Sequence, residues 1–229
     1  MNLKTLNPLF YFDLENTTQH ADISCLNKKE LNMLAERMER TNKITTNDPD
    51  YSAKLEKFYQ DTAPVLPEYG KIICMSYGIV KADNIIINSF IETEEGEEAL
   101  ITMIHKAFNK IEGKFTLCGW NIKAYDIPWL IKKFIKYGLN VPKILNFANK
   151  KPREIEVLDL KEIWKFNSYF DCTFDECCYM LGIDSPKAEM SGKDVYSEYY
   201  AGNLAKIVKY CESDVKALIS VEKKLTTHL

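Results

Sequence analysis

The feature that most constrains the fold is an apolar run near the N-terminus that ends on two acids. Residues 8–15, PLFYFDLE, are apolar except for Asp13 and Glu15. Strands covered on both faces have such continuous apolar runs, so we expect a central strand here. Side chains alternate along a strand, which places Asp13 and Glu15 on one face. Two carboxylates this close repel unless a cation lies between them, so the pair indicates either a metal site or a strand that runs out into solvent.

The remaining pattern predicts an α/β architecture. We expect further strands over 70–80, 84–91, 114–120 and 154–160, and helices over 27–42, 51–61, 97–112, 126–137, 173–181, 195–200 and 203–225. Three successive strands can form an antiparallel meander, and the helical crossovers that follow require parallel neighbours with right-handed connections. The sequence has no Gly/Ser linker, so we expect one domain over residues 1–229 with a helical insert at about 18–63.

Composition narrows the class of protein. With 229 residues the chain is long enough for one α/β core. A net charge of −3 counts against coating nucleic acid by bulk electrostatics, though not against holding a nucleic acid end through bound metal. An odd number of cysteines, seven, favours reduced thiols and a cytoplasmic location. The sequence has no apolar run near the roughly 20 residues that a membrane helix needs, so we expect no membrane partner.

Two more acids follow in the second half of the chain. Asp126 opens the helix after the fourth expected strand, five residues beyond Asn121, and could equally be a helix cap. In the last helix Asp214 lies about 60° from the centre of the apolar stripe, with Tyr210 one turn earlier on the same side. We therefore expect Asp214 to face the sheet, whereas Glu212 should be solvated. A purely packing role for Tyr210 is the alternative.

Taken together, these segments resemble a known family. FDLEN, NIKAYDIP and YCESD occur in the order of the three motifs of the tyrosine (DEDDy) branch of the DnaQ-like 3′–5′ exonucleases. The stretch MLGIDSPKAEMSGKDVYSEYYAGN resembles a stand-alone subgroup related to the proofreading exonuclease domain of family-B DNA polymerases. The resemblance implies a ribonuclease H-like fold with a five-stranded mixed sheet, order 3-2-1-4-5, flanked by helices.

The resemblance also implies residue roles. Two Mg²⁺ or Mn²⁺ ions would be held by four acids: Asp13, Glu15, Asp126 and Asp214. Asp13 would bridge both ions, and Asp126 would act through water. The Tyr210 hydroxyl would orient the attacking water, since an ordinary phenol keeps its proton at pH 7 and is no base.

Four residues are candidate substrate contacts. Asn16 stands where the family commonly has Thr, and Asn121 stands where the second motif often has Asn. Tyr125 could stack on an unpaired base. Lys187 could contact a phosphate, with a solvated loop lysine as the alternative.

The leading hypothesis is a two-metal 3′–5′ exonuclease that shortens single-stranded DNA from its 3′ end and releases nucleoside 5′-monophosphates. A ribonuclease of the same fold is the nearest alternative, because the choice depends on whether the pocket tolerates a 2′-hydroxyl. A non-catalytic nucleic-acid or partner-binding module would be expected to lack one of the acids. A helical interaction scaffold built on residues 27–61 is a further alternative. Whether a separate polymerase or repair protein is a partner stays open.

Overall fold

The computed structural model describes residues 7–82, 84–148, 150, 154–185 and 190–229. Lys187, one of the candidate substrate contacts, lies outside these described residues. Among the described residues, no helix is both long and apolar enough to cross a lipid bilayer.

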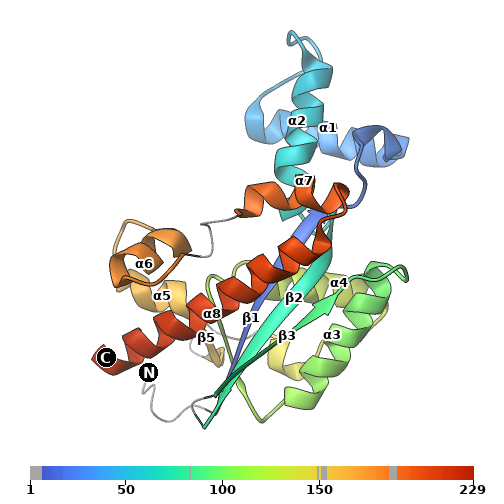
Figure 1. Ribbon diagram of the computed structural model, residues 1–229. Coiled ribbons are helices and arrows are strands. Elements are labelled where there is room, and N and C mark those ends of the chain that lie inside the picture. The colour runs from blue at the N-terminus through green and yellow to red at the C-terminus, as the bar shows by residue number, and fades with distance from the viewer. Residues whose placement is uncertain (1–6, 83, 149, 151–153, 186–189) are drawn as a thin grey trace.

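A five-stranded mixed sheet lies at the centre of the molecule (Figure 1). Its order is β3-β2-β1-β4-β5, which confirms the predicted order. β1 pairs antiparallel with β2, β2 antiparallel with β3, and the last two strands run parallel to β1. The strands are β1 (Leu9–Thr18), β2 (Gly70–Lys81), β3 (Asn84–Ile91), β4 (Thr116–Gly119) and β5 (Val157–Asp159).

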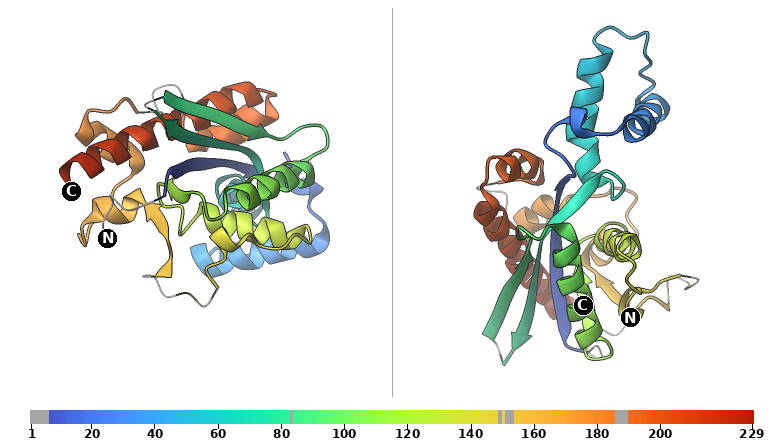
Figure 2. Two further views of the ribbon diagram at one scale, coloured as in Figure 1. Left: turned by 90° about the horizontal axis from the view of Figure 1, so that it is seen from below. Right: turned by 90° about the vertical axis from the view of Figure 1, so that its right-hand side faces the viewer.

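Helices cover both faces of this sheet. Figure 2 shows α8 on one side of the sheet, and α3 and α4 on the other. The insert helices α1 and α2 lie beyond the end of the sheet (Figure 1). The helices are α1 (Lys28–Asn42), α2 (Tyr51–Thr62), α3 (Glu97–Ile111), α4 (Asp126–Lys136), α5 (Leu160–Lys165), α6 (Phe174–Leu181), α7 (Val195–Tyr200) and α8 (Leu204–His228).

Alternation along β1 divides its side chains between two cores. Phe10, Phe12 and Leu14 pack in the larger core with residues of α3 and α4. Tyr11 packs in a second core with residues of α8. Because the period of a strand is two, Asp13 and Glu15 continue the row of Tyr11 and face α8.

Gly78 lets α8 approach the sheet closely. It lies opposite Tyr11 on β2. A Cβ atom at this position would be 2.8 Å from Cγ1 of Val215, the residue that follows Asp214. Any side chain here would push α8 outwards, so the missing side chain helps to set the distance between Asp214 and β1.

Two local features differ from the expectations. β1 continues to Thr18 rather than ending near residue 15, and its register against β2 shifts between Glu15 and Asn16, a β-bulge of the kind found next to active sites. The strand expected over 154–160 is limited to β5, because the Asp159 side chain accepts a hydrogen bond from the Lys161 amide and caps α5, a helix that we did not predict.

A buried ion pair joins the sheet to α3 and α4. Lys133 and Glu97 are almost fully buried, and Nζ of Lys133 lies 2.9 Å from Oε1 of Glu97. Glu97 also accepts hydrogen bonds from the Ile72 amide and the Tyr137 hydroxyl, at 2.8 and 2.6 Å. Lys133 donates to the carbonyl of Gly70 at 2.6 Å. Both charges are therefore paired and hydrogen-bonded, as buried charges must be.

We expect Glu97→Ala to lower the free energy of unfolding by about 3–5 kcal/mol, because it leaves the Lys133 ammonium buried without its counter-charge. The neighbouring Glu98→Ala is the matched control: Glu98 is exposed in the same first turn of α3, and its loss should cost less than about 0.5 kcal/mol. Urea unfolding of both variants measures the difference. Equal losses would contradict a structural role for the buried pair.

Candidate active site

A cavity of about 840 Å³ opens beside the second half of β1. Most of the residues that the sequence singled out line it: Asp13, Glu15, Asn16, Tyr125, Tyr210 and Asp214. They come from β1, from the start of α4 and from α8. The sheet order explains this meeting, since α8 crosses the sheet over β1 and β4 leads directly into the loop before α4.

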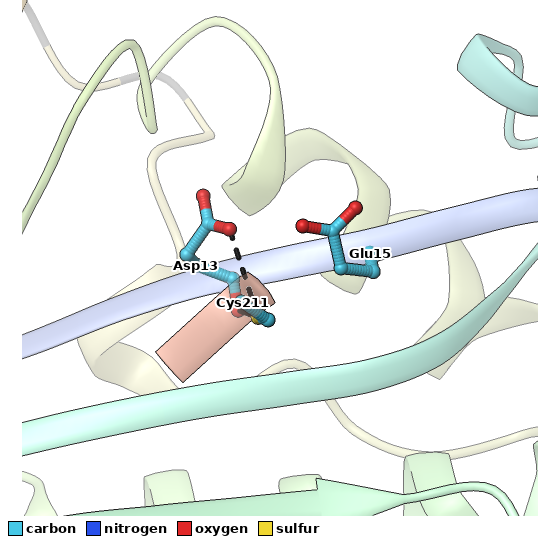
Figure 3. Close-up of side chains that lie close together, drawn as sticks. All are labelled: Asp13, Glu15 and Cys211. Atoms are coloured by element: carbon cyan, nitrogen blue, oxygen red, sulfur yellow. Dashed lines mark hydrogen bonds between the residues drawn. The ribbon is translucent and has the colours of Figure 1, made fainter. Parts of the chain in front are cut away.

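Asp13 and Glu15 project from the same side of β1, and Cys211 of α8 lies beside them (Figure 3). Ligand atoms of these three residues all lie within 4.8 Å of one another. The Cys211 thiol donates weakly to the backbone carbonyl and to Oδ2 of Asp13, at 3.5 and 3.6 Å. Burial raises the pKa of this thiol well above its usual range, so it stays protonated and acts as a donor.

Sequence reasoning missed this role of Cys211, because a cysteine within the apolar stripe of the last helix is typical of a buried packing residue. Its position three residues before Asp214 was the available signal, since residues three apart lie on the same side of a helix.

The acids strongly affect one another. The pKa of Asp13 is raised well above its ordinary value by burial and by the charges of Asp214, Glu15 and Asp126. The pKa of Glu15 is likewise raised well above its ordinary value, by burial and by the charges of Asp214 and Asp126. A cluster of this kind cannot be fully ionised at neutral pH unless positive charge is brought to it.

Asp214 and Tyr210 lie one turn apart on α8, as predicted from their spacing. Asp214 is 9% exposed and Tyr210 is half-buried. The Tyr210 hydroxyl forms a hydrogen bond with the Asp214 carboxylate. Burial and the charges of Asp214, Glu15 and Asp13 raise the pKa of Tyr210 far above that of a free phenol, so the hydroxyl stays protonated. The expectation that Glu212 is solvated was wrong. Glu212 is half-buried and accepts a hydrogen bond from Ser89.

Asp126 is the first residue of α4, and its side chain is not the helix cap that we considered as an alternative. It is 3% exposed and lies close enough to affect the pKa values of Asp13 and Glu15. Burial raises its own pKa to about 7, although the backbone amides of Asp126 and Leu14 partly offset this. Its carboxylate therefore sits behind the cluster rather than at the cavity surface.

Asp159, which sequence reasoning also missed, holds the loop that leads to Asp126. Its carboxylate accepts hydrogen bonds from the amides of Asn121 and Lys123, at 2.9 and 3.1 Å. Asn121 has a positive φ of 61°, a conformation that such a side-chain anchor helps to fix. Asp159 is a positioning residue, and the apolar run before it gave no hint of this role.

The candidate substrate contacts have different surroundings. Asn16 donates from Nδ2 to the Tyr125 hydroxyl at 3.2 Å, and both residues line the cavity. The Oδ1 atom of Asn16 is buried and has no hydrogen-bond partner among the described residues. Asn121 lines a neighbouring depression that shares Trp120 with the main cavity.

The donor set fits a hard divalent cation. Three carboxylates, those of Asp13, Glu15 and Asp214, line one cavity, and a fourth, from Asp126, lies behind them. Oxygen donors of this type suit Mg²⁺ and Mn²⁺, whereas a protonated thiol such as Cys211 does not ligate them. A bound cation would also relieve the repulsion that raises the pKa values.

Comparison with known sequences gives one family. A family model described as a predicted 3′–5′ exonuclease related to the exonuclease domain of PolB matches residues 64–219. No curated protein matches the chain by sequence.

Two solved structures are similar to this chain at low sequence identity. The family B DNA polymerase from the hyperthermophilic archaeon Pyrobaculum calidifontis is 13% identical with a TM-score of 0.58, over 96% of this chain and 24% of the polymerase chain. E. coli exonuclease I in complex with a dT13 oligonucleotide is 13% identical with a TM-score of 0.46, over 96% of this chain and 41% of its own. This chain thus spans about a quarter of the polymerase, and the first similarity supports the ribonuclease H-like fold.

We predict that the metal-free protein loses stability as the pH rises. In the unfolded chain Asp126 titrates near pH 4, at about the ordinary value for Asp. In the folded protein its pKa is about 7. The folded state thus binds more protons between these values, so this stability contribution is complete below about pH 4 and is lost as the pH rises through 7.

Urea unfolding in EDTA at several pH values checks this. The free energy of unfolding of the wild type should fall relative to that of Asp126→Asn between about pH 5 and pH 8. A difference that does not change with pH would show that Asp126 titrates normally.

Proposed function

This chain belongs to the family of predicted 3′–5′ exonucleases related to the exonuclease domain of PolB, and we propose that it shortens single-stranded DNA from the 3′ end by metal-dependent hydrolysis. The products would be nucleoside 5′-monophosphates. Residues 1–229 would form one exonuclease domain, with the helical insert at about 18–63.

The observation that carries this proposal is the group of acids beside one cavity, in which the pKa values of Asp13, Glu15 and Asp126 are raised. Asp13, Glu15 and Asp214 come from two elements that are far apart in sequence and both line the cavity. Burying several carboxylates together destabilises a protein unless a cation balances them, so a purely structural role is unfavourable. The cavity volume, about 840 Å³, is within the range of ligand-binding sites.

Asp13, Glu15 and Asp214 would hold two Mg²⁺ or Mn²⁺ ions, with Asp126 acting through water. When bound, these ions supply an activated water and neutralise charge on the leaving 3′-oxygen. The Cys211 thiol, which donates to Asp13 Oδ2, favours one rotamer of that carboxylate. The buried position of Asp126 supports a role through water rather than direct contact.

Tyr210 would orient the attacking water rather than remove its proton. Burial and the neighbouring carboxylates raise its pKa in the metal-free protein, so the hydroxyl carries its proton there. Its hydrogen bond to Asp214 fixes the direction of the hydroxyl and couples it to a proposed metal ligand. Because the hydroxyl donates its one proton to Asp214, its oxygen can accept a hydrogen bond from the attacking water.

Asn16 and Tyr125 would contact the terminal nucleotide. The unpaired Oδ1 of Asn16 can accept a hydrogen bond from the terminal 3′-hydroxyl, which would satisfy a buried acceptor. The Tyr125 ring offers a surface on which the last base can stack. These two residues are already joined by a hydrogen bond, so the terminal nucleotide would meet a preformed surface.

We predict that a 5′-labelled single-stranded DNA is degraded to a ladder that shortens from the 3′ end in Mg²⁺ or Mn²⁺. Asp13→Ala and Asp214→Asn should each lower kcat by more than about 100-fold, since even the partners behind metal ligands can cost 10- to 100-fold. Glu212→Gln is the matched control on α8, because Glu212 hydrogen-bonds Ser89 of β3.

Matched RNA and EDTA arms complete this assay. Faster degradation of RNA than of DNA would replace the DNA assignment with a ribonuclease of the same fold. Binding of both substrates without cleavage would contradict catalysis and favour a binding module.

For Tyr210→Phe we expect kcat to fall about 10- to 100-fold with little change in KM, because the ring remains and only the orienting hydroxyl is lost. Steady-state kinetics on the same oligonucleotide measure both constants. An unchanged kcat would show that the hydroxyl does not contribute to the reaction.

A further inference from the structure

The helical insert is a fixed part of the molecule with a core of its own. Leu34 and Met38 of α1 pack with Leu55, Phe58 and Tyr59 of α2. Hydrogen bonds connect the base of the insert to α7: the Tyr196 hydroxyl donates to the Ala21 carbonyl at 2.6 Å, and the Tyr200 hydroxyl donates to the Thr18 carbonyl at 2.8 Å. Within the insert, the Tyr59 hydroxyl donates to the His20 carbonyl at 2.9 Å. These contacts fix the orientation of α2 relative to the end of β1.

α2 turns a second face towards the proposed active site. Residues of α2 and of the turn that follows it line the same cavity as the acids: Lys57, Gln60, Asp61, Pro64 and Val65. The three that belong to α2 lie at helical spacing and are distinct from its buried residues. These three residues do not belong to the core of the insert. Packing within the insert therefore does not explain why they line the cavity.

Charge indicates what this wall can bind. The cavity is rich in acids, and the described residues that line it include two lysines, Lys57 and Lys193. Lys57 has a partner in Asp61, at 3.1 Å, but both side chains are more than 60% exposed. An ion pair this exposed contributes little to stability, so the ammonium is available for a phosphate. Gln60 is exposed beside it and can both donate and accept hydrogen bonds.

We propose that α2 binds the substrate strand on the 5′ side of the scissile bond, with Lys57 on a phosphate and Gln60 on the neighbouring nucleotide. This proposal rests on the proposed function, because it assigns a path to the same single strand. The acids hold the terminal nucleotide, and the insert holds the part of the strand that remains after cleavage. The insert is therefore a determinant of substrate length.

Two substrates separate this proposal from the function itself. The p-nitrophenyl ester of thymidine 5′-monophosphate carries only the terminal nucleotide, whereas a ten-nucleotide DNA also carries the strand that would reach α2. We expect the ratio of kcat/KM for the oligonucleotide to kcat/KM for the ester to fall about tenfold in Lys57→Glu, as for a lost charged hydrogen bond. The salt slope of log(kcat/KM) on the oligonucleotide should become shallower by about 0.7, which corresponds to one lost phosphate contact on a single strand. Gln60→Ala should lower the ratio in the same direction without this change in slope.

Lys29→Glu is the matched control. Lys29 is exposed on α1 of the same insert and is not among the residues that line the cavity, and its substitution changes the net charge equally. This variant should keep the wild-type ratio. A ratio unchanged in Lys57→Glu, or lowered equally in Lys29→Glu, overturns the proposal. A wild type that cleaves neither substrate refutes the proposed function instead.

Discussion

The feature on which the site depends is the close approach of several carboxylates where β1 packs against α8. Alternation along β1 puts Asp13 and Glu15 on the side that packs against α8, and α8 adds Asp214 from the opposite direction. Burial and mutual repulsion raise the pKa values of Asp13 and Glu15, so the cluster destabilises the metal-free protein, and a bound cation would remove this cost. The carboxylate cluster lowers the free energy of unfolding of the metal-free protein, and the packing around it compensates for this loss.

Several contacts outside the cluster keep it in place. The absence of a side chain at Gly78 lets α8 lie close to β2, and Asp159 holds the loop that leads into α4. The β-bulge shifts the register of β1 between Glu15 and Asn16. It therefore separates a candidate metal ligand, Glu15, from a candidate substrate contact, Asn16. On the other face, the Lys133–Glu97 pair links α4, which begins at Asp126, to α3 and β2. The geometry of the cluster is therefore set from both sides of the sheet.

Much of the fold could be predicted because it depends on local periodicity. The apolar runs and helical stripes predicted the strands and nearly every helix, and the spacing of Tyr210 and Asp214 predicted their common side. The order of the strands in the sheet came from the family resemblance. What could not be predicted depends on contacts between distant segments. Cys211 meets Asp13 only after α8 docks on the sheet, and Ser89 partly buries Glu212 only because β3 passes beside α8. The face of α2 that lines the cavity is polar, so its sequence resembles any solvated helix face.

The central claim is that the acids form a divalent cation site. The most direct measurement is the crystal structure of the protein grown with Mn²⁺ and thymidine 5′-monophosphate, with anomalous differences recorded at the manganese edge. We expect anomalous peaks in contact with the carboxylates of Asp13, Glu15 and Asp214, and the nucleotide phosphate beside them. Nucleotide bound in the cavity without manganese at these carboxylates, or manganese bound only elsewhere on the molecule, would contradict this account.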